Sequence, residues 1–296
     1  MRKFLLTLIF FSSIHIAMAQ QQYFMSQYLQ HNFMFNPAAA GVSGKDMVGV
    51  SYRSMWSSFP GNPITSVVYG DFNLKKLDAG FGALIYNDQT GPTSRTGFQL
   101  DYSYHLKSKV EKNKFSIGLE TKAIQYSIDK SKLDPIDPAF IGAENKFVFD
   151  AGAGVYWTND KLTAGASVNQ FMRSTLDMAD APYTSQRARL YRHYNVTASY
   201  KFQTGDDIYL IPNFMYREIE NSPSEWDFGL KLDYQDKLWW ALIWKVNQSW
   251  SLQAGLKILD RIRATYSYDY YQTPLSVFAG GSAANEVGIR FDLTKK

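Results

Sequence analysis

Few residues in this chain have the types and spacing that catalysis requires. Of its four histidines, His31, His105 and His193 lie beyond the first twenty residues. Ser103 and His105 are two residues apart, so in an extended strand they share a face, as a serine nucleophile and its base could. Such pairs arise by chance in many strands, and no oxyanion loop is recognisable nearby. We therefore predict that the protein is not an enzyme and has no catalytic residues.

Metal and cofactor sites are equally poorly supported. The absence of cysteine excludes disulfides, cysteine-ligated zinc and thiol catalysis. Asp134 and Asp137 could suggest calcium, but two carboxylates are too few for the 6 to 8 oxygens that calcium takes. Pro135 and Pro138 already explain that stretch as a rigid loop. We predict no metal and no cofactor.

Composition narrows the class of protein. The chain has 31 Lys+Arg against 27 Asp+Glu, a formal charge of +4, and no basic cluster stands out. This excludes nucleic acid as a partner, because a nucleic-acid binder needs a basic patch. The aromatic content of 16% together with 20 glycines is typical of a large β-structure.

The first 19 residues have the pattern of a secretory signal peptide. Arg2 and Lys3 precede an apolar run, and Ala17-Met18-Ala19 forms a small-residue cleavage site before Gln20. The alternative, a membrane-anchoring helix, is weaker because the run is shorter than the roughly 20 apolar residues needed to span a bilayer. The remaining chain has no second long apolar run, so residence in a membrane would require strands.

Alternation of apolar and polar residues runs through the rest of the chain. In the clearest case, Trp226, Phe228, Leu230, Leu232 and Tyr234 alternate with polar residues or glycine, as in a strand with two different faces. The period predicts about fourteen strands, near residues 45–53, 64–73, 79–87, 94–106, 113–126, 146–157, 161–169, 191–202, 207–217, 225–234, 237–246, 249–257, 261–270 and 285–293. Most have about the 9 to 11 residues of a transmembrane β-strand.

The connections between these strands alternate in length. Short ones, such as 74–78 and 158–160, alternate with the long ones Ser127 to Asn145, Gln170 to Leu190 and Tyr271 to Asn285. Outer-membrane barrels have tight periplasmic turns and longer external loops. We therefore predict an all-β protein, a transmembrane antiparallel β-barrel of about 14 strands with long extracellular loops and short periplasmic turns.

Glycines and charges indicate how the lumen is filled. Gly80, Gly82, Gly152, Gly154 and Gly165 fall inside strands, where they cost stability unless a bulky group approaches, so we expect a crowded lumen. The charged strand faces should point inward. They could pair into a network that closes the lumen or form a wet polar wall, and the sequence favours neither. These residues are Asp101, His105, Glu120, Lys122, Asp150, Lys231, Asp233, Arg263, Asp269, Arg290 and Asp292.

The segment before the first strand, residues 20–44, carries a more specific pattern. A Gln27-Tyr28 start, Asn36-Pro37-Ala38-x-x-Gly41, Arg53-x-x-Trp56 and Gly61-x-Pro63-x-Thr65 resemble the N-terminal signature of the PorP/SprF family of type IX secretion system outer-membrane proteins. A last strand at 285–291 agrees with this resemblance. The family-motif residues are Asn36, Pro37, Gly41, Arg53, Trp56, Pro63 and Thr65. On physical grounds alone, Asn-Pro and Gly-x-Pro specify rigid turns, and we favour a structural role.

The resemblance implies an outer-membrane component needed for export or surface attachment of specific secreted proteins, such as gliding adhesins. Implied partners are a secreted cargo protein or adhesin, periplasmic and outer-membrane secretion-system proteins, and the lipid bilayer. The alternative is a passive outer-membrane porin or solute channel. We expect a signal peptide (1–19), a periplasmic N-terminal segment (20–44) and a barrel (45–296). Aromatic residues and arginine dominate interface energetics, so candidate partner-binding loop residues are Phe140, Phe171, Arg173, Tyr183, Arg187, Arg189, Tyr271 and Phe278.

Overall fold

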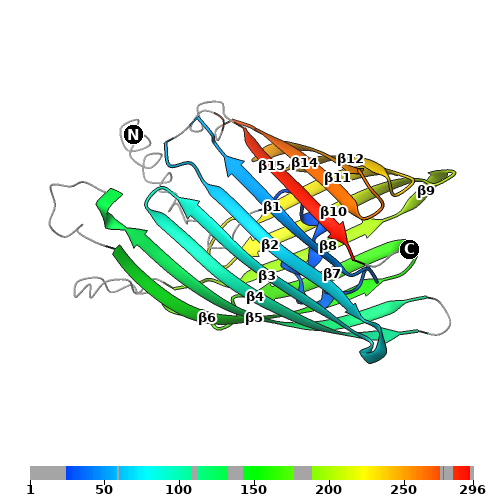
Figure 1. The fold of residues 1–296 in the computed structure, drawn as a ribbon, viewed down its shortest axis with the longest axis horizontal. Helices are drawn as coiled ribbons and strands as arrows, with labels where there is room; N and C mark the ends of the chain where they lie inside the picture. Colours follow the sequence, from blue (N-terminus) through cyan, green and yellow to red (C-terminus); the bar gives the residue numbers. More distant parts are fainter. Residues whose placement is uncertain are drawn as a thin grey trace, which may run out of the picture.

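Fifteen strand segments form a single closed antiparallel sheet in the computed structural model, which describes residues 25–58, 60–108, 112–132, 143–176, 189–273, 276 and 283–293. Apart from β8 and β9, consecutive segments pair with each other, and the last pairs with the first, from Met47↔Asp292 to Met55↔Ala284 (Figure 1). The strands are β1 (Met47–Met55), β2 (Ile64–Leu74), β3 (Ala79–Thr90), β4 (Thr93–Lys107), β5 (Lys114–Asp129), β6 (Ala143–Thr158), β7 (Leu162–Asn169), β8 (His193–Tyr200), β9 (Phe202–Gly205), β10 (Ile208–Ile219), β11 (Glu225–Tyr234), β12 (Leu238–Lys245), β13 (Ser249–Lys257), β14 (Ile262–Tyr271) and β15 (Ala284–Asp292).

The wall is a 14-stranded barrel, as the sequence predicts. Segments β8 and β9 both pair with β10 and are separated only by Lys201, so they occupy one position in the wall. Closure gives each of the 14 wall positions a neighbour on both sides, although β6 pairs with β7 only along Ala153–Thr158. Among the described residues, no helix is long and apolar enough to cross a membrane.

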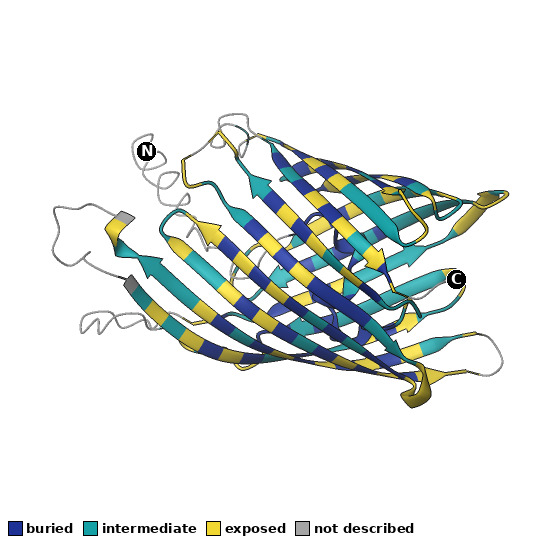
Figure 2. Cartoon of the chain, in the orientation of Figure 1, coloured by how far each residue is buried: buried dark blue, intermediate teal, exposed yellow. Residues whose placement is uncertain are grey.

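Side chains alternate between the two faces of the wall (Figure 2). On β11, Trp226, Phe228 and Leu230 are exposed outside, whereas Asp227 between them is buried. The same alternation buries most of the charges that we expected to point inward, including Asp101, Glu120, Lys122, Asp150 and Asp269. An apolar outer face and a polar inner face are what a barrel in lipid requires.

The two ends of the barrel differ. One end, which we call the turn end, carries the connections after β2, β4, β6, β9, β11 and β13 together with the described C-terminus. The other, the loop end, carries the long connections after β5, β7 and β14. The alternation of lengths is less strict than expected, because the loop end also has tight connections at Gly91–Pro92 and Val246–Gln248. Gly91 permits the first of these because its φ of 56° is accessible to glycine.

The described part of the N-terminal segment lies inside the barrel, and this corrects our expectation of a separate periplasmic segment. Its short 3₁₀ helices, η1 (Tyr28–Gln30), η2 (Asn32–Met34) and η3 (Pro37–Ala39), are surrounded by the strands (Figure 1, dark blue). Met25, Tyr28, Phe33 and Met34 are almost fully buried. The strands around the lumen shield these side chains from water. Two further 3₁₀ turns, η4 (Lys75–Leu77) and η5 (Lys130–Lys132), lie in the connections after β2 and β5. The predicted signal peptide lies outside the described residues.

Candidate functional site

The N-terminal segment forms a plug, Met25–Gly41, that runs the length of the lumen. Ser26 contacts residues near the loop end of β1, β12, β14 and β15, whereas Gly41 contacts β2 near the turn end. We divide the plug into an arm, Met25–His31, and an anchor, Asn32–Gly41. The lumen is therefore filled by the chain's own N-terminal segment, which neither alternative for the charged strand faces had included.

Asn36 fixes the anchor to the wall. Its side-chain amide donates to the carbonyl of Val155 on β6 (3.0 Å) and to that of Ala166 on β7 (3.3 Å). Its Oδ1 accepts the N–H of Ala38 at 3.0 Å and so caps η3. Pro37 occupies the first position of that turn, where a missing N–H costs nothing. The Asn-Pro-Ala motif thus specifies a rigid turn that also carries a wall contact.

Glycines of the wall make room for the anchor. A Cβ on Gly118 would lie 2.2 Å from the nitrogen of Ala38, and one on Gly154 would lie 2.1 Å from Oδ1 of Asn36. A Cβ on Gly80 would approach the carbonyl oxygen of Ala40 even more closely. Our prediction that strand glycines mark a crowded lumen is confirmed, because plug atoms occupy the Cβ space of four of the five glycines and the side chains of Glu120 and Asn169 crowd the fifth, Gly152.

Gly41 ends the anchor at the turn end. It has a φ of +66°, which favours glycine, and a Cβ there would meet the backbone of Gly80 and Phe72 at 2.6 Å. Its N–H donates to Asp71, and its carbonyl accepts from the side-chain amide of Asn73 at 2.6 Å. The plug is thereby tied to β2 just before the chain enters β1.

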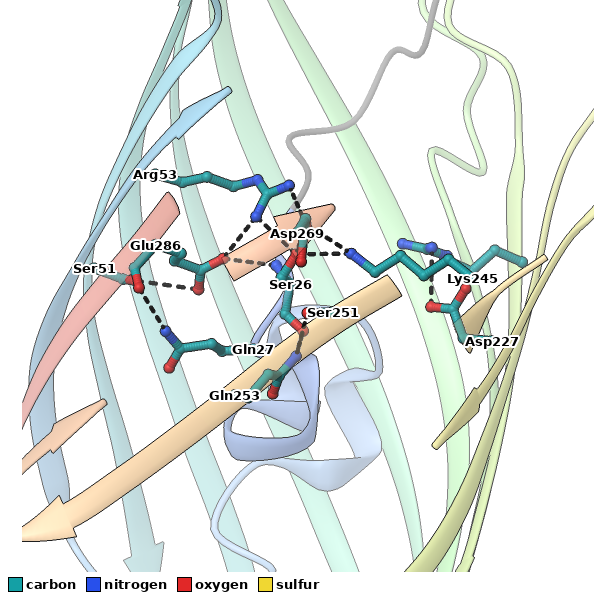
Figure 3. Close-up of polar contacts among 11 residues, drawn as sticks. Ser26, Gln27, Ser51, Arg53, Asp227, Lys245, Ser251, Gln253, Asp269 and Glu286 are labelled. Atoms are coloured by element: carbon teal, nitrogen blue, oxygen red, sulfur yellow. Dashed lines mark hydrogen bonds and ion pairs between the residues drawn. The ribbon is translucent and has the colours of Figure 1, made fainter. Parts of the chain in front are cut away.

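At the loop end, four charged wall residues form a buried cluster around Ser26, which we call the latch (Figure 3). Arg53 pairs with Asp269 (2.7 Å) and with Glu286 (3.4 Å), and Lys245 pairs with Asp269 (3.1 Å). All four side chains are no more than 1% exposed. Two cations and two anions leave the latch electrically neutral, as buried charges require.

Ser26 completes the latch with both its backbone and its hydroxyl. Its N–H donates to Glu286 (2.7 Å), and its carbonyl accepts from Gln253 (2.8 Å). The hydroxyl donates to Asp269 and accepts from Arg53 and Lys245, each at 2.7 Å. Sequence reasoning missed Ser26, Lys245 and Glu286, although the alternation on β12 and β15 places the latter two on the inner face.

Four of the seven family-motif residues belong to the anchor or the latch. Asn36, Pro37 and Gly41 belong to the anchor, whereas Arg53 belongs to the latch. Thr65 faces Arg53 across the β1–β2 register and donates to Asp88 at 2.7 Å.

The last two motif residues shape the β1–β2 connection. Trp56 has a φ of 51° and packs 6.0 Å from the ring of Tyr271, and the carbonyl of Pro63 accepts from Met55. Contacts of the plug and the wall thus account for every motif residue, in keeping with the structural role that we favoured.

The predicted loop residues lie in different environments. Phe171 and Arg189 are exposed, and Arg173 pairs with Glu220 at 3.2 Å. Tyr271 is a correction: it ends β14 on the inner face and is only 7% exposed, so it packs with Trp56 and is not available to a partner. Phe140, Tyr183, Arg187 and Phe278 lie outside the described residues, as do Asp134 and Asp137.

The Ser103 and His105 pair has structural contacts. The Ser103 hydroxyl donates to the carbonyl of Ala40 at 2.7 Å, and Nδ1 of His105 lies 2.8 Å from the hydroxyl of Ser116. Both Ser103 and His105 are buried beneath the plug. Within the described ranges, no group of three or more His, Asp or Glu residues has the arrangement of a metal site.

Comparisons with known proteins agree with this architecture. The family model described as type IX secretion system membrane protein PorP/SprF matches residues 17–284. A comparison with curated protein sequences gives no match. Among solved structures, a FadL homologue from Pseudomonas aeruginosa shares 12% identity with a TM-score of 0.51, over 88% of this chain and 94% of that one. The CymD monoaromatic hydrocarbon channel shares 8% with a TM-score of 0.50, over 88% and 90%. These structural likenesses show the fold alone. Most of the chain matches the family model, and it belongs to the PorP/SprF family of type IX secretion system membrane proteins, with the fold of an outer-membrane β-barrel.

Proposed function

We propose that export or surface attachment of specific secreted proteins, such as gliding adhesins, depends on this barrel as a docking component of the type IX secretion system. Membership of the family supports the link to secretion. The plugged lumen supports the rest of the proposal, because a lumen occupied by the chain itself leaves no path through which an exported protein could cross the membrane. The barrel then contributes its surface and its loops, and the cargo crosses the membrane elsewhere.

The plug also counts against a passive porin. A porin needs a water-filled path through its lumen, whereas here Phe33, Met34 and Ala38 fill the interior and are each at most 2% exposed. Asn36 and Gly41 hold this segment through hydrogen bonds to three different strands. Such contacts are typical of a permanent part of the fold.

Among the described residues, those of the loop after β7 form the surface that best suits a partner. Phe171 and Met172 are 56% and 62% exposed at the loop end. The guanidinium of Arg192 lies 5.2 Å from the Phe171 ring, and the Arg173–Glu220 pair holds the loop base to the connection after β10. Exposed apolar side chains on a fixed base suit protein recognition. We place this loop end at the cell surface and the turn end in the periplasm, where secretion-system partners would bind.

Substitution of both exposed residues tests this proposal. In a strain lacking the native gene, we expect Phe171→Ser with Met172→Ser to assemble normally and to lower the surface level of the cognate secreted protein. The matched control is Leu77→Ser, an exposed apolar residue at the turn end that is 62% exposed. Surface cargo is measured by antibody on intact cells. Normal surface cargo in the gene-deletion strain would contradict the proposed function. Normal cargo in the Phe171 and Met172 variant alone would contradict recognition by this loop.

A further inference from the structure

The arm and the anchor of the plug differ in how well their polar groups are satisfied. Four buried polar side-chain atoms of the plug have no hydrogen-bond partner among the described residues: Gln27 Oε1, Tyr28 Oη, Gln30 Nε2 and His31 Nδ1. All four belong to the arm. A buried polar group without a partner costs free energy, which it regains on exposure to water. The free energy needed to move the arm out of the lumen is therefore smaller than its burial alone suggests.

The anchor has the opposite character. Its Asn32 and Asn36 amides are bonded to Tyr156 and to wall carbonyls, and its backbone fits against Gly80 and Gly118. Removing the anchor would leave an empty space beside these glycines that fits only backbone atoms. It would also leave the carbonyls of Val155 and Ala166 without their hydrogen bonds from the Asn36 amide. The anchor should stay in place when the arm leaves.

Departure of the arm leaves the latch intact. Arg53, Lys245, Asp269 and Glu286 remain paired with one another, because Ser26 contributes hydrogen bonds and no charge. The space that the arm leaves would lie between the anchor and the loop end of the described wall strands. Its wall still offers the acceptor, donor and hydroxyl-binding groups that Ser26 uses now.

We propose that the arm is removable and that its departure opens a cup facing the loop end, which binds an extended, uncharged peptide segment in place of Ser26 and Gln27. The peptide N–H and C=O take the positions of Ser26 against Glu286 and Gln253, and a serine or threonine hydroxyl fits between Asp269, Arg53 and Lys245. An acidic or a basic residue there would add an uncompensated charge to the two cations and two anions that cancel in the latch. The site therefore selects against both charges.

That such a peptide comes from an exported protein rests on the proposed function, whereas the movement of the arm and the existence of the cup do not. The chain has no cysteine, so a single introduced thiol reports on one position. Met25 in the arm and Met34 in the anchor are matched probes, since they are the same residue type and are 2% and 1% exposed.

The first measurement compares Met25→Cys with Met34→Cys in the purified full chain, using a water-soluble maleimide. We expect Met25→Cys to be labelled at least about tenfold faster, because local opening exposes the arm without global unfolding. Equal labelling rates, or faster labelling of Met34→Cys, would overturn the removable arm.

The second measurement uses Ser26→Asp, which adds a third carboxylate beside Asp269 and Glu286 and should expel the arm. We expect it to speed labelling of Met25→Cys and not of Met34→Cys. The same variant should bind a fluorescent peptide with the sequence of residues 25–31, and should not bind the peptide carrying aspartate for serine. Failure of the first peptide to bind would overturn the cup, as would equal binding of both. These assays need no secretion, so loss of the proposed function in cells would leave them unaffected.

Discussion

Gly118 is the position where one added methyl group should separate the plug from the wall. In Gly118→Ala the new Cβ would lie 2.2 Å from the nitrogen of Ala38 and 2.4 Å from the carbonyl carbon of Pro37, where ordinary contacts begin at 3.4 Å. Both neighbours are backbone atoms, so the anchor must shift by about an ångström to restore ordinary contact. Asn36 then loses its bonds to Val155 and Ala166, worth about 1 kcal/mol each. With a further overpacking cost of about 1–3 kcal/mol, we expect the anchor to be weakened by at least about 3 kcal/mol.

The assay is maleimide labelling of Met34→Cys with and without Gly118→Ala. A loss of about 3 kcal/mol corresponds to a rate increase of about a hundredfold if the anchor opens and recloses rapidly. The control is Gly205→Ala at the end of β9, where a Cβ would meet only Ile208, at 3.3 Å and beyond. The urea unfolding midpoint checks that the barrel wall is retained. Labelling of the Gly118 variant at the rate of the Gly205 control, with the wall intact, would refute the packing argument.

Two further predictions concern the latch and the topology. Arg53→Gln leaves Asp269 and Glu286 buried with Lys245 as the one remaining cation of the latch, and should destabilise the protein by about 3–5 kcal/mol in urea unfolding. Arg173→Gln, at a pair that is 28% and 29% exposed, should cost about 1 kcal/mol or less. Similar costs for the two variants would contradict the importance of charge pairing in the latch. A protease site inserted at Ser131 should be cut in whole cells and one at Asn159 should be protected, because the two positions lie at opposite ends of the barrel. The reverse pattern would show that the loop end faces the periplasm.

The wall could be predicted from the sequence because the alternation that identifies each strand lies within that strand's own residues. Trp226 to Tyr234 alternates residue by residue between lipid and lumen, and the predicted strand 225–234 coincides with β11. Strands that face two different solvents need this period over their whole length, so segments could be identified without knowledge of their neighbours. Three strands, β3, β5 and β6, extend three residues beyond their predicted bounds at the loop end.

The plug could not be placed in this way. Residues 25–41 have no two-residue period, and their burial depends on contacts with strands more than a hundred residues away, such as Ser26 with Glu286 and Asn36 with Val155. The glycines did carry the signal: Gly80 and Gly154 indicated a crowded lumen, but nothing in a single sequence says which segment crowds it. Latch membership of Lys245 and Glu286 likewise required the register between β12, β14 and β15.

Single-channel conductance of the purified wild-type protein in a planar bilayer tests the central claim most directly. A barrel whose lumen is filled by its own N-terminal segment should show no steady conductance, and Gly118→Ala should introduce openings by loosening the anchor. A steady, porin-sized conductance in the wild type that Gly118→Ala leaves unchanged would contradict the plugged lumen and, with it, a role in docking rather than conduction.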